Sequence, residues 1–154
     1  MKLFHFLCIA FICTTLSAPL SVEAASPEYT ALSQKLVEQA TQLLNKKDTT
    51  KANNILNLAL TADPANARAY IIKGQAMRLA NKPAEGLRLI TIGLEIEPLN
   101  VEGLILQGQA ALDVKDFKKA QASFKQAAPL CMRDCPHAAA LVEGVARMNT
   151  KNNE

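Results

Sequence analysis

Residues 67–100 hold one complete unit of the repeat that decides the fold, ARAYIIKGQAMRLANKPAEGLRLITIGLEIEPLN. A similar unit starts at Val101, and matching residues recur 34 positions apart, as Gly74 and Gly108 do. A fixed period of this length is typical of a solenoid, in which each helix pair buries its apolar face by stacking on its neighbours. The sequence therefore predicts a repeat protein, and such arrays usually bind other chains rather than perform chemistry.

Each unit contains two helical patterns separated by a turn. In the unit quoted above, apolar residues from Tyr70 to Leu79 fall at helical spacing, and Asn66 precedes them as a cap. Pro83 then opens a second helix, in the first turn, where its missing N–H costs nothing. The first unit, which starts at Ser33, follows the same plan less clearly. The pattern predicts three helix-turn-helix units.

Equivalent places in the units hold large apolar and small residues in a fixed order. They are Leu36, Ala40, Leu43, Ala52, Leu56, Ala59 and Pro64 in the first unit, Tyr70, Gly74, Met77, Gly86, Ile90, Gly93 and Pro98 in the second, and Leu104, Gly108, Ala111, Ala120, Phe124 and Ala127 in the third. This order resembles the tetratricopeptide repeat (TPR), in which small residues let two helices cross closely. The third unit departs from that family at its end, where Pro129 arrives early.

The resemblance implies an all-α, right-handed solenoid of three helix-turn-helix units and a C-terminal capping helix. We expect a lead-in at residues 25–32, repeats at 33–66, 67–100 and 101–130, a disulfide turn and capping helix at 131–149, and a frayed tail at 150–154. The capping helix is indicated by apolar residues that share one face between Ala138 and Met148. Such a helix covers the last apolar surface of a solenoid.

The first 24 residues have the pattern of a signal peptide. A basic start precedes an almost wholly apolar run from Leu3 to Leu16, and Val22 and Ala24 suit a signal peptidase. A run of about 14 residues is short for a membrane span, which needs about 20. We expect cleavage after Ala24 and export to the periplasm of a Gram-negative bacterium. The alternative is an uncleaved N-terminal anchor.

Charge and composition exclude several kinds of partner and chemistry. The chain has 17 Lys and Arg against 14 Asp and Glu, a formal net charge of +3, and 5% aromatic residues. Basic and acidic residues alternate without long runs, so we expect neither nucleic acid nor a membrane surface as a partner. His137 has no serine or carboxylate that the sequence places beside it, and phosphate-binding glycine motifs are absent. We therefore expect no enzyme, no metal and no cofactor.

If the family geometry holds, the first helices of the units line a concave groove that binds a peptide. The expected lining residues are Gln34, Val37, Thr41 and Leu44, then Arg68, Ile71, Gln75 and Arg78, then Glu102, Ile105, Gln109 and Leu112. The apolar members would anchor apolar ligand side chains; alternatively, they pack between neighbouring helices. Some members of the family hold a C-terminal carboxylate through Lys and Asn. Val37 and Thr41 occupy two of those places, so we do not expect that clamp.

Cys131 and Cys135 remain after signal removal, and an even pair in an exported chain indicates a disulfide. Closing this short loop would join the last repeat to the cap and contribute about 2 kcal/mol through loop entropy. The alternative is a redox-active pair, because Arg133 and the start of the cap helix could favour the thiolate of Cys135. Pro136 stands where a covalent haem site needs histidine, and His137 alone does not complete a zinc site.

The sequence thus favours a scaffold or adaptor that binds a peptide segment of another envelope protein during cell-envelope assembly. One alternative is an accessory thiol-disulfide redox or cytochrome-maturation protein that uses Cys131 and Cys135. Another is a homo-oligomer, in which the groove or an exposed edge binds a second copy of the chain.

Overall fold

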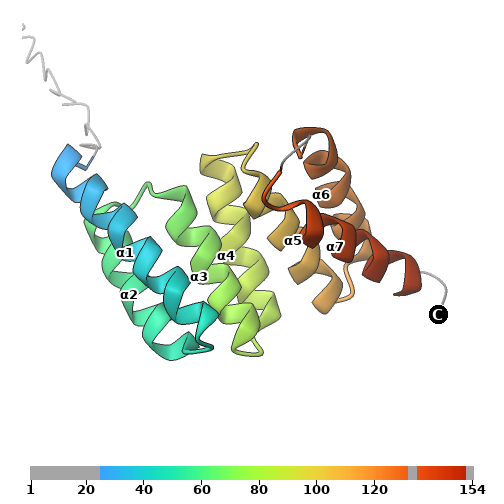
Figure 1. The fold of residues 1–154 in the computed structure, drawn as a ribbon, viewed down its shortest axis with the longest axis horizontal. Helices are drawn as coiled ribbons and strands as arrows, with labels where there is room; N and C mark the ends of the chain where they lie inside the picture. Colours follow the sequence, from blue (N-terminus) through green and yellow to red (C-terminus); the bar gives the residue numbers. More distant parts are fainter. Residues whose placement is uncertain (1–24, 132–134, 152–154) are drawn as a thin grey trace, which may run out of the picture.

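The computed structural model describes residues 25–131 and 135–151, and within these ranges all regular structure is helical. Seven α-helices follow one another in this part of the chain (Figure 1). They are α1 (Pro27–Asn45), α2 (Thr49–Ala62), α3 (Ala67–Leu79), α4 (Pro83–Ile96), α5 (Val101–Asp113), α6 (Phe117–Leu130) and α7 (Ala138–Lys151). The first six form three consecutive pairs and α7 follows them, which confirms the predicted solenoid of three helical units and a capping helix.

Side-chain caps fix where four of these helices begin. The side chains of Asp48, Asn66, Asn100 and Asp116 each accept a hydrogen bond, at 2.9 to 3.0 Å, from the backbone N–H three residues ahead. Each bond satisfies an N–H group that the first turn of a helix leaves without a partner. Asn66 is therefore the cap that the sequence predicted.

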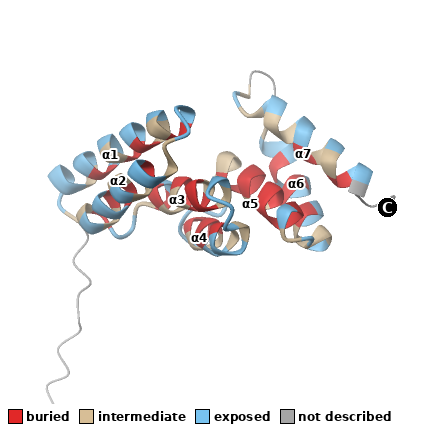
Figure 2. Ribbon diagram, turned by 90° about the horizontal axis from the view of Figure 1, so that it is seen from below, coloured by how far each residue is buried: buried red, intermediate tan, exposed pale blue. Residues whose placement is uncertain are grey.

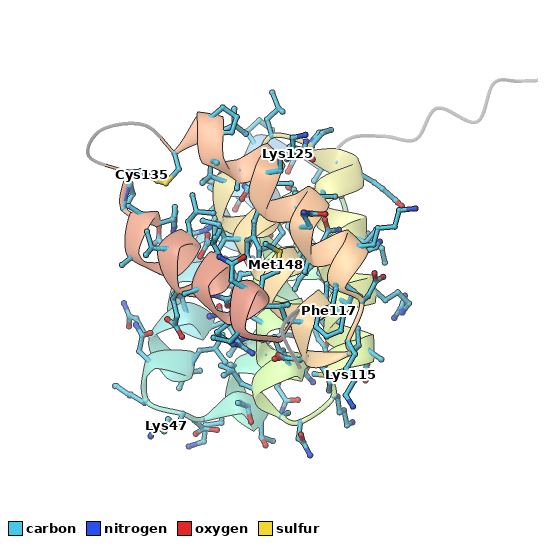
Figure 3. The ribbon with its side chains drawn as sticks, turned by 90° about the vertical axis from the view of Figure 1, so that its right-hand side faces the viewer. Lys47, Lys115, Phe117, Lys125, Cys135 and Met148 are labelled. Carbon is cyan, nitrogen blue, oxygen red and sulfur yellow. A yellow bond between two sulfur atoms is a disulfide. The ribbon has the colours of Figure 1, made fainter. Side chains whose placement is uncertain are left out.

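The turn inside each unit has the same backbone conformation. Lys47, Asn81 and Lys115 have φ of 62°, 62° and 63°, in the left-handed region. After α1, the N–H of Asp48 donates to the carbonyl of Leu43 at 3.0 Å, as in a Schellman helix end. Lys47 and Lys115 lie at the same edge of the solenoid (Figure 3). A residue with a Cβ atom is unfavourable in this region, so the left-handed conformation of both lysines lowers the stability of the fold.

The core consists of two clusters that meet at α3. Ile72 and Ala76 pack with residues of α1 and α2, such as Leu56. Ile71, which precedes Ile72 in the sequence, belongs to a larger cluster that includes Phe124. The buried residues lie where successive helices face one another (Figure 2). Each unit therefore completes its core only against its neighbour.

Gly74 and Gly108 lie at close helix crossings, as the sequence predicted. A Cβ atom on Gly74 would lie 2.6 Å from the carbonyl oxygen of Gly86 and 2.5 Å from Cγ1 of Ile90, both on α4. A Cβ atom on Gly108 would collide with the ring of Phe124 on α6. The absence of a side chain at these positions lets the two helices of a unit pack at short distance.

Two helix boundaries differ from the expected ones. α1 begins at Pro27, so most of the expected lead-in is helical; a proline at this position is favourable because its N–H would have no partner there. α7 extends to Lys151, which includes part of the expected tail. α6 contains Pro129 and ends at Leu130, the last residue of the expected third repeat.

Two expectations fall on residues outside the described ranges. These are the signal peptide at residues 1–24 and the last part of the tail, residues 152–154. Among the helices that the structure does describe, none has the length and apolar character that crossing a membrane requires.

Candidate functional site

The first helices of the units lie together on one side of the solenoid. α1 packs against α3, α3 against α5 and α5 against α7, whereas within the described residues α2, α4 and α6 contact only the helices next to them in sequence. The side that carries α1, α3 and α5 is therefore the tighter, concave one. Figure 2 shows α1 and α7 on either side of α3 and α5. We call this surface the concave face.

The structure corrects the expected apolar lining of this face. Val37, Ile71, Ile105 and Leu112 are at most 2% exposed, and Leu44 is 6% exposed. These side chains fill the space between neighbouring helices, which is the alternative interpretation of their pattern. Three residues of an α-helix span about 300°, so Val37 and Ile71 each point about 60° away from the exposed residues Gln34 and Arg68, which lie three positions earlier. Val37, Ile71, Ile105 and Leu112 therefore offer almost no surface to a peptide in this conformation.

The polar members of the expected groove lie nearer the surface. Gln34 and Arg68 are exposed, whereas Gln109 is an exception, because it is buried at 9% exposure, contrary to the expectation. The half-buried members are Thr41, Gln75, Arg78 and Glu102. The hydroxyl of Thr41 donates to the carbonyl of Val37 at 2.8 Å, so its proton is used within its own helix. The concave face is therefore polar.

Ion pairs connect the helices along the concave face. Nε of Arg68 on α3 lies 3.5 Å from Oε2 of Glu102 on α5. Asp113, the last residue of α5, accepts hydrogen bonds from Nε of Arg78 on α3 at 2.6 Å and from Nη2 of Arg147 on α7 at 2.8 Å. The carboxylate of Asp113 thus ties three helices together.

The surroundings of Asp113 lower its pKa. Partial burial alone would raise this pKa, but the hydrogen bonds and charges of Arg147 and Arg78 favour the carboxylate and outweigh that effect. Asp113 therefore stays ionised at neutral pH and holds α7 against the concave face. Sequence reasoning named Arg78 but missed its partner Asp113 and the second arginine on that carboxylate, because these residues lie in other helices, 35 residues from Arg78 to Asp113 and 34 from Asp113 to Arg147.

A polar cavity of about 370 Å³ opens between the first half of α1, the start of α3 and the turn before α5. We call it the polar cavity. Its lining residues are Thr30, Gln34, Glu38, Asp63, Ala65, Asn66, Ala67, Arg68, Glu97 and Asn100. Nδ2 of Asn66 also donates to Oγ of Ser33 at 2.8 Å, which fixes the turn after α2 against α1. The cavity brings together Gln34 and Arg68, which the sequence predicted, with acidic residues that it did not single out.

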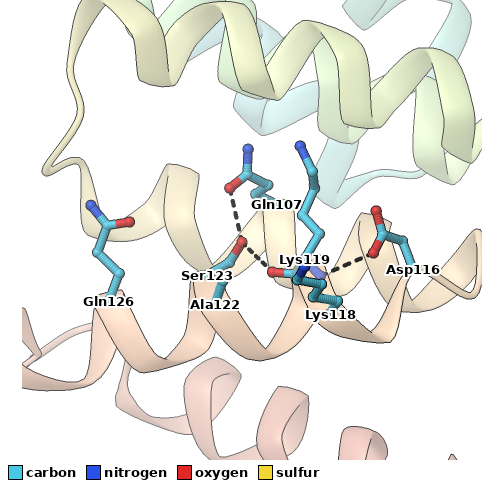
Figure 4. Close-up of a pocket in the computed structure, with 7 residues that line it drawn as sticks. All are labelled: Gln107, Asp116, Lys118, Lys119, Ala122, Ser123 and Gln126. Carbon is cyan, nitrogen blue, oxygen red and sulfur yellow. Dashed lines mark hydrogen bonds between the residues drawn. The ribbon is translucent and has the colours of Figure 1, made fainter.

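A second cavity, of about 400 Å³, lies between α5 and α6 (Figure 4). Here Oγ of Ser123 lies 2.8 Å from Oε1 of Gln107 and 2.9 Å from the carbonyl oxygen of Lys119. Gln107 also donates to Oγ1 of Thr91 on α4 at 3.1 Å. Gln107 is five residues from Glu102 and so points to the opposite side of α5. This network links α4, α5 and α6 away from the concave face.

The two cysteines join the last repeat to the capping helix. The Cα atoms of Cys131 and Cys135 lie 5.2 Å apart, and the structure connects their sulfur atoms (Figure 3). Arg133, which the redox interpretation uses, lies outside the described residues. In the part of the chain that the structure describes, His, Cys, Asp and Glu form no group of three or more that could hold a metal ion. Whether the pair is structural or redox-active stays a prediction.

Comparison with known proteins supports the fold through structure rather than sequence. The sequence matches no family model and no curated protein. The TPR2B domain of yeast Sti1 in its pHsp70 complex superposes with a TM-score of 0.70 at 15% identity, over 79% of this chain and 98% of that chain. The Sgt2 TPR domain from Aspergillus fumigatus gives 0.70 at 21% identity, over 85% and 83%.

A third similar structure is the first TPR domain of RPAP3 bound to the HSP90 peptide SRMEEVD. It has a TM-score of 0.69 at 13% identity and covers 80% of this chain and 98% of that chain. At these identities the likeness shows the fold alone. Together with the helical repeats described above, it shows that the chain folds as an all-α TPR solenoid.

Proposed function

We propose that this protein is an interaction scaffold that binds a segment of a partner protein on its concave face. The observation that carries the proposal is the polar cavity, because residues of α1, of α3 and of the turn between α4 and α5 line it together. A ligand that fills it would contact the first two repeats and the turn that leads into the third, which suits a chain segment laid across the units. The similar domains of Sti1 and RPAP3, whose structures contain pHsp70 and an HSP90 peptide, support this use of the fold.

Binding at this face would rely on polar contacts. The predicted apolar anchors are buried, whereas the amides of Gln34 and Gln75 and the guanidinium of Arg68 remain at or near the surface. Such groups can pair with the backbone N–H and C=O groups of an extended segment. A segment held mainly by its backbone gains less from apolar burial, so we expect binding in the transient range rather than a permanent complex.

We further propose that the protein acts in the cell envelope after export. The apolar run of residues 3–16 and the cysteine pair support this location. Fractionation of cells that express the full sequence, with N-terminal sequencing of the product, tests it. A product that starts at Ala25 in the periplasmic fraction is expected, and a cytoplasmic product that keeps Met1 would contradict the proposal.

The scaffold function is tested by crosslinking and affinity capture from envelope extract with two matched double variants. Gln34→Ala with Arg68→Ala changes exposed residues of the polar cavity. Gln121→Ala with Arg88→Ala makes the same chemical changes at exposed positions of α6 and α4 that do not line it. A partner that is lost only with the first pair supports binding at the concave face.

Equal capture by both variants would place the binding surface elsewhere on the molecule. Sedimentation analysis of the same samples separates the homo-oligomer alternative, because self-association would appear without any extract. A dimer that the Gln34 and Arg68 changes disrupt would make the partner a second copy of this chain.

A further inference from the structure

The charged side chains around the polar cavity are mainly acidic. Glu38 of α1, Asp63 in the turn before α3 and Glu97 at the end of α4 line it, with Arg68 as the single basic residue among the lining. Three carboxylates and one guanidinium give the lining a formal charge of −2. The chain as a whole carries +3, so this negative charge is a local property of the cavity.

The arginines of the concave face are already paired with carboxylates of the chain itself. Arg68 lies 3.5 Å from Glu102, and Arg78 and Arg147 both bind Asp113. An acidic ligand would have to compete with these internal partners. By contrast, Glu38 and Glu97 have no ion pair with any residue that the structure describes. The charge left for a ligand is therefore negative.

Asp63 adds a buried group that lacks a full set of partners. Its side chain lines the polar cavity although the residue is only 8% exposed. Oδ1 accepts a hydrogen bond from the N–H of Ala65 at 3.0 Å, and among the described residues no donor reaches Oδ2. Oδ2 is not one of the buried side-chain atoms without a partner, so this oxygen is open to the cavity. An ammonium or guanidinium group in the cavity would supply the missing partner.

We propose that the polar cavity binds the charged end of a lysine or arginine side chain, so that the concave face selects basic segments of a partner protein over acidic ones. This inference rests on the proposed scaffold function. The cavity, at about 370 Å³, falls within the range of about 300–1,000 Å³ that small-molecule sites occupy. One long side chain fits that space, while the rest of the segment lies across the repeats.

The same charges work against an acidic ligand. The peptide SRMEEVD in the RPAP3 structure carries three carboxylate side chains. A segment of that kind would meet Glu38 and Glu97 here, while Arg68 is held by Glu102. Like charges placed close together lower affinity and thereby exclude wrong partners. This chain would therefore differ in ligand charge from that domain despite the shared fold.

The test uses a small probe that isolates the charge. Nα-acetyl-arginine methylamide and its citrulline analogue have the same shape, but citrulline is neutral. Protein produced from the full 154-residue sequence is titrated with each probe at low salt, and NMR follows the backbone amides of Ala65, Asn66 and Ala67 in the cavity wall. We expect shifts at these amides and an affinity about fivefold higher for the arginine compound, the effect of removing a partly exposed charge pair.

Variants then assign the effect to the cavity. Glu38→Gln with Glu97→Gln should lower the affinity for the arginine compound about fivefold, and Asp63→Asn should lower it while keeping the Oδ1 acceptor of the turn. Glu85→Gln with Glu95→Gln, at exposed positions of α4 outside the cavity, is the matched control and should leave binding unchanged. Equal affinity for the two probes, no shift at the three amides, or an equal loss with the control pair would each overturn the proposal.

This result is separate from the test of the scaffold function. If a partner depends on Gln34 and Arg68 but the two probes bind equally, the proposed scaffold function stands and the proposed cation site is wrong. If the cavity binds the arginine compound selectively but no partner binds at the concave face, the proposed cation site stands and the proposed scaffold function is wrong.

Discussion

Replacing Gly74 with alanine sets helix propensity against packing. Gly74 lies in the middle of α3, where alanine is favoured over glycine by about 1 kcal/mol. The added Cβ atom, however, would lie 2.6 Å from the carbonyl oxygen of Gly86 and 2.5 Å from Cγ1 of Ile90. The first of these is a backbone atom, which cannot turn aside as the end of a flexible side chain can.

The packing term should outweigh the propensity term. Overpacking of a tight core costs about 1–3 kcal/mol, and a collision with backbone belongs near the upper end of that range. After the propensity gain, Gly74→Ala should lower the free energy of unfolding by about 1–2 kcal/mol. For a domain of this size that corresponds to a fall in melting temperature of about 5 °C. Gly74→Leu and Gly108→Leu should cost more, because each adds a larger side chain at a crossing.

Circular dichroism during heating and during urea titration measures this change. Ala146→Gly, at an exposed position in the interior of α7, measures the propensity term alone in the same protein and should cost about 1 kcal/mol. A Gly74→Ala protein that melts at or above the temperature of the unchanged protein would show that α3 and α4 do not cross closely at this residue.

Three further predictions concern the core, the turns and the ion pairs. Ile71→Arg should destabilise by about 3 kcal/mol or more because it buries a charge, whereas Leu79→Arg, at an exposed site on the same helix, should change the melting temperature little; similar losses would contradict the burial of Ile71. Lys47→Gly should raise stability by about 0.5–1 kcal/mol in urea unfolding, since φ is 62° there, and a lower midpoint would contradict this. The pKa of Asp113 is lowered on folding, so its contribution is present above the pKa of the unfolded chain and is lost as pH falls through the lower, folded value. The difference in melting temperature between the unchanged protein and Asp113→Asn should therefore shrink below about pH 4, and a constant difference from pH 6 to pH 3 would argue against the ion pairs.

The helices, caps and crossings could be predicted because their signals are local or periodic. Asn66 precedes a helical pattern directly, and Gly74 and Gly108 recur at the repeat distance. Caps and helix crossings of this kind depend on residues within one repeat, and the next repeat shows the same residues again. Helix ends were predicted less closely, since α7 continues to Lys151 although a frayed tail was expected from Thr150. Pro129 does not end α6 early, because a proline in the last turn removes only one backbone hydrogen bond.

The direction of each groove residue and its charge partners could not be predicted in the same way. Ile71 and Arg68 are three residues apart, and a rotation of about 60° decides that one is core and the other surface. That rotation is set by the neighbouring helices. Asp113 and Arg147 meet only because α7 folds back on the concave face, an arrangement that no short pattern in the sequence reports.

The division of the core at α3 has a consequence for how the molecule opens. Ile71 and Ile72 are neighbours in sequence but belong to different apolar clusters, so α1 and α2 share a cluster with α3 and with no later helix. In a linear array of this kind, one end can unfold while the rest stays intact. Amide hydrogens of α1 and α2 should therefore exchange with solvent faster than those of α5. Local opening of the first repeat would expose one wall of the polar cavity and give a bulky segment a route into it without unfolding of the remaining repeats.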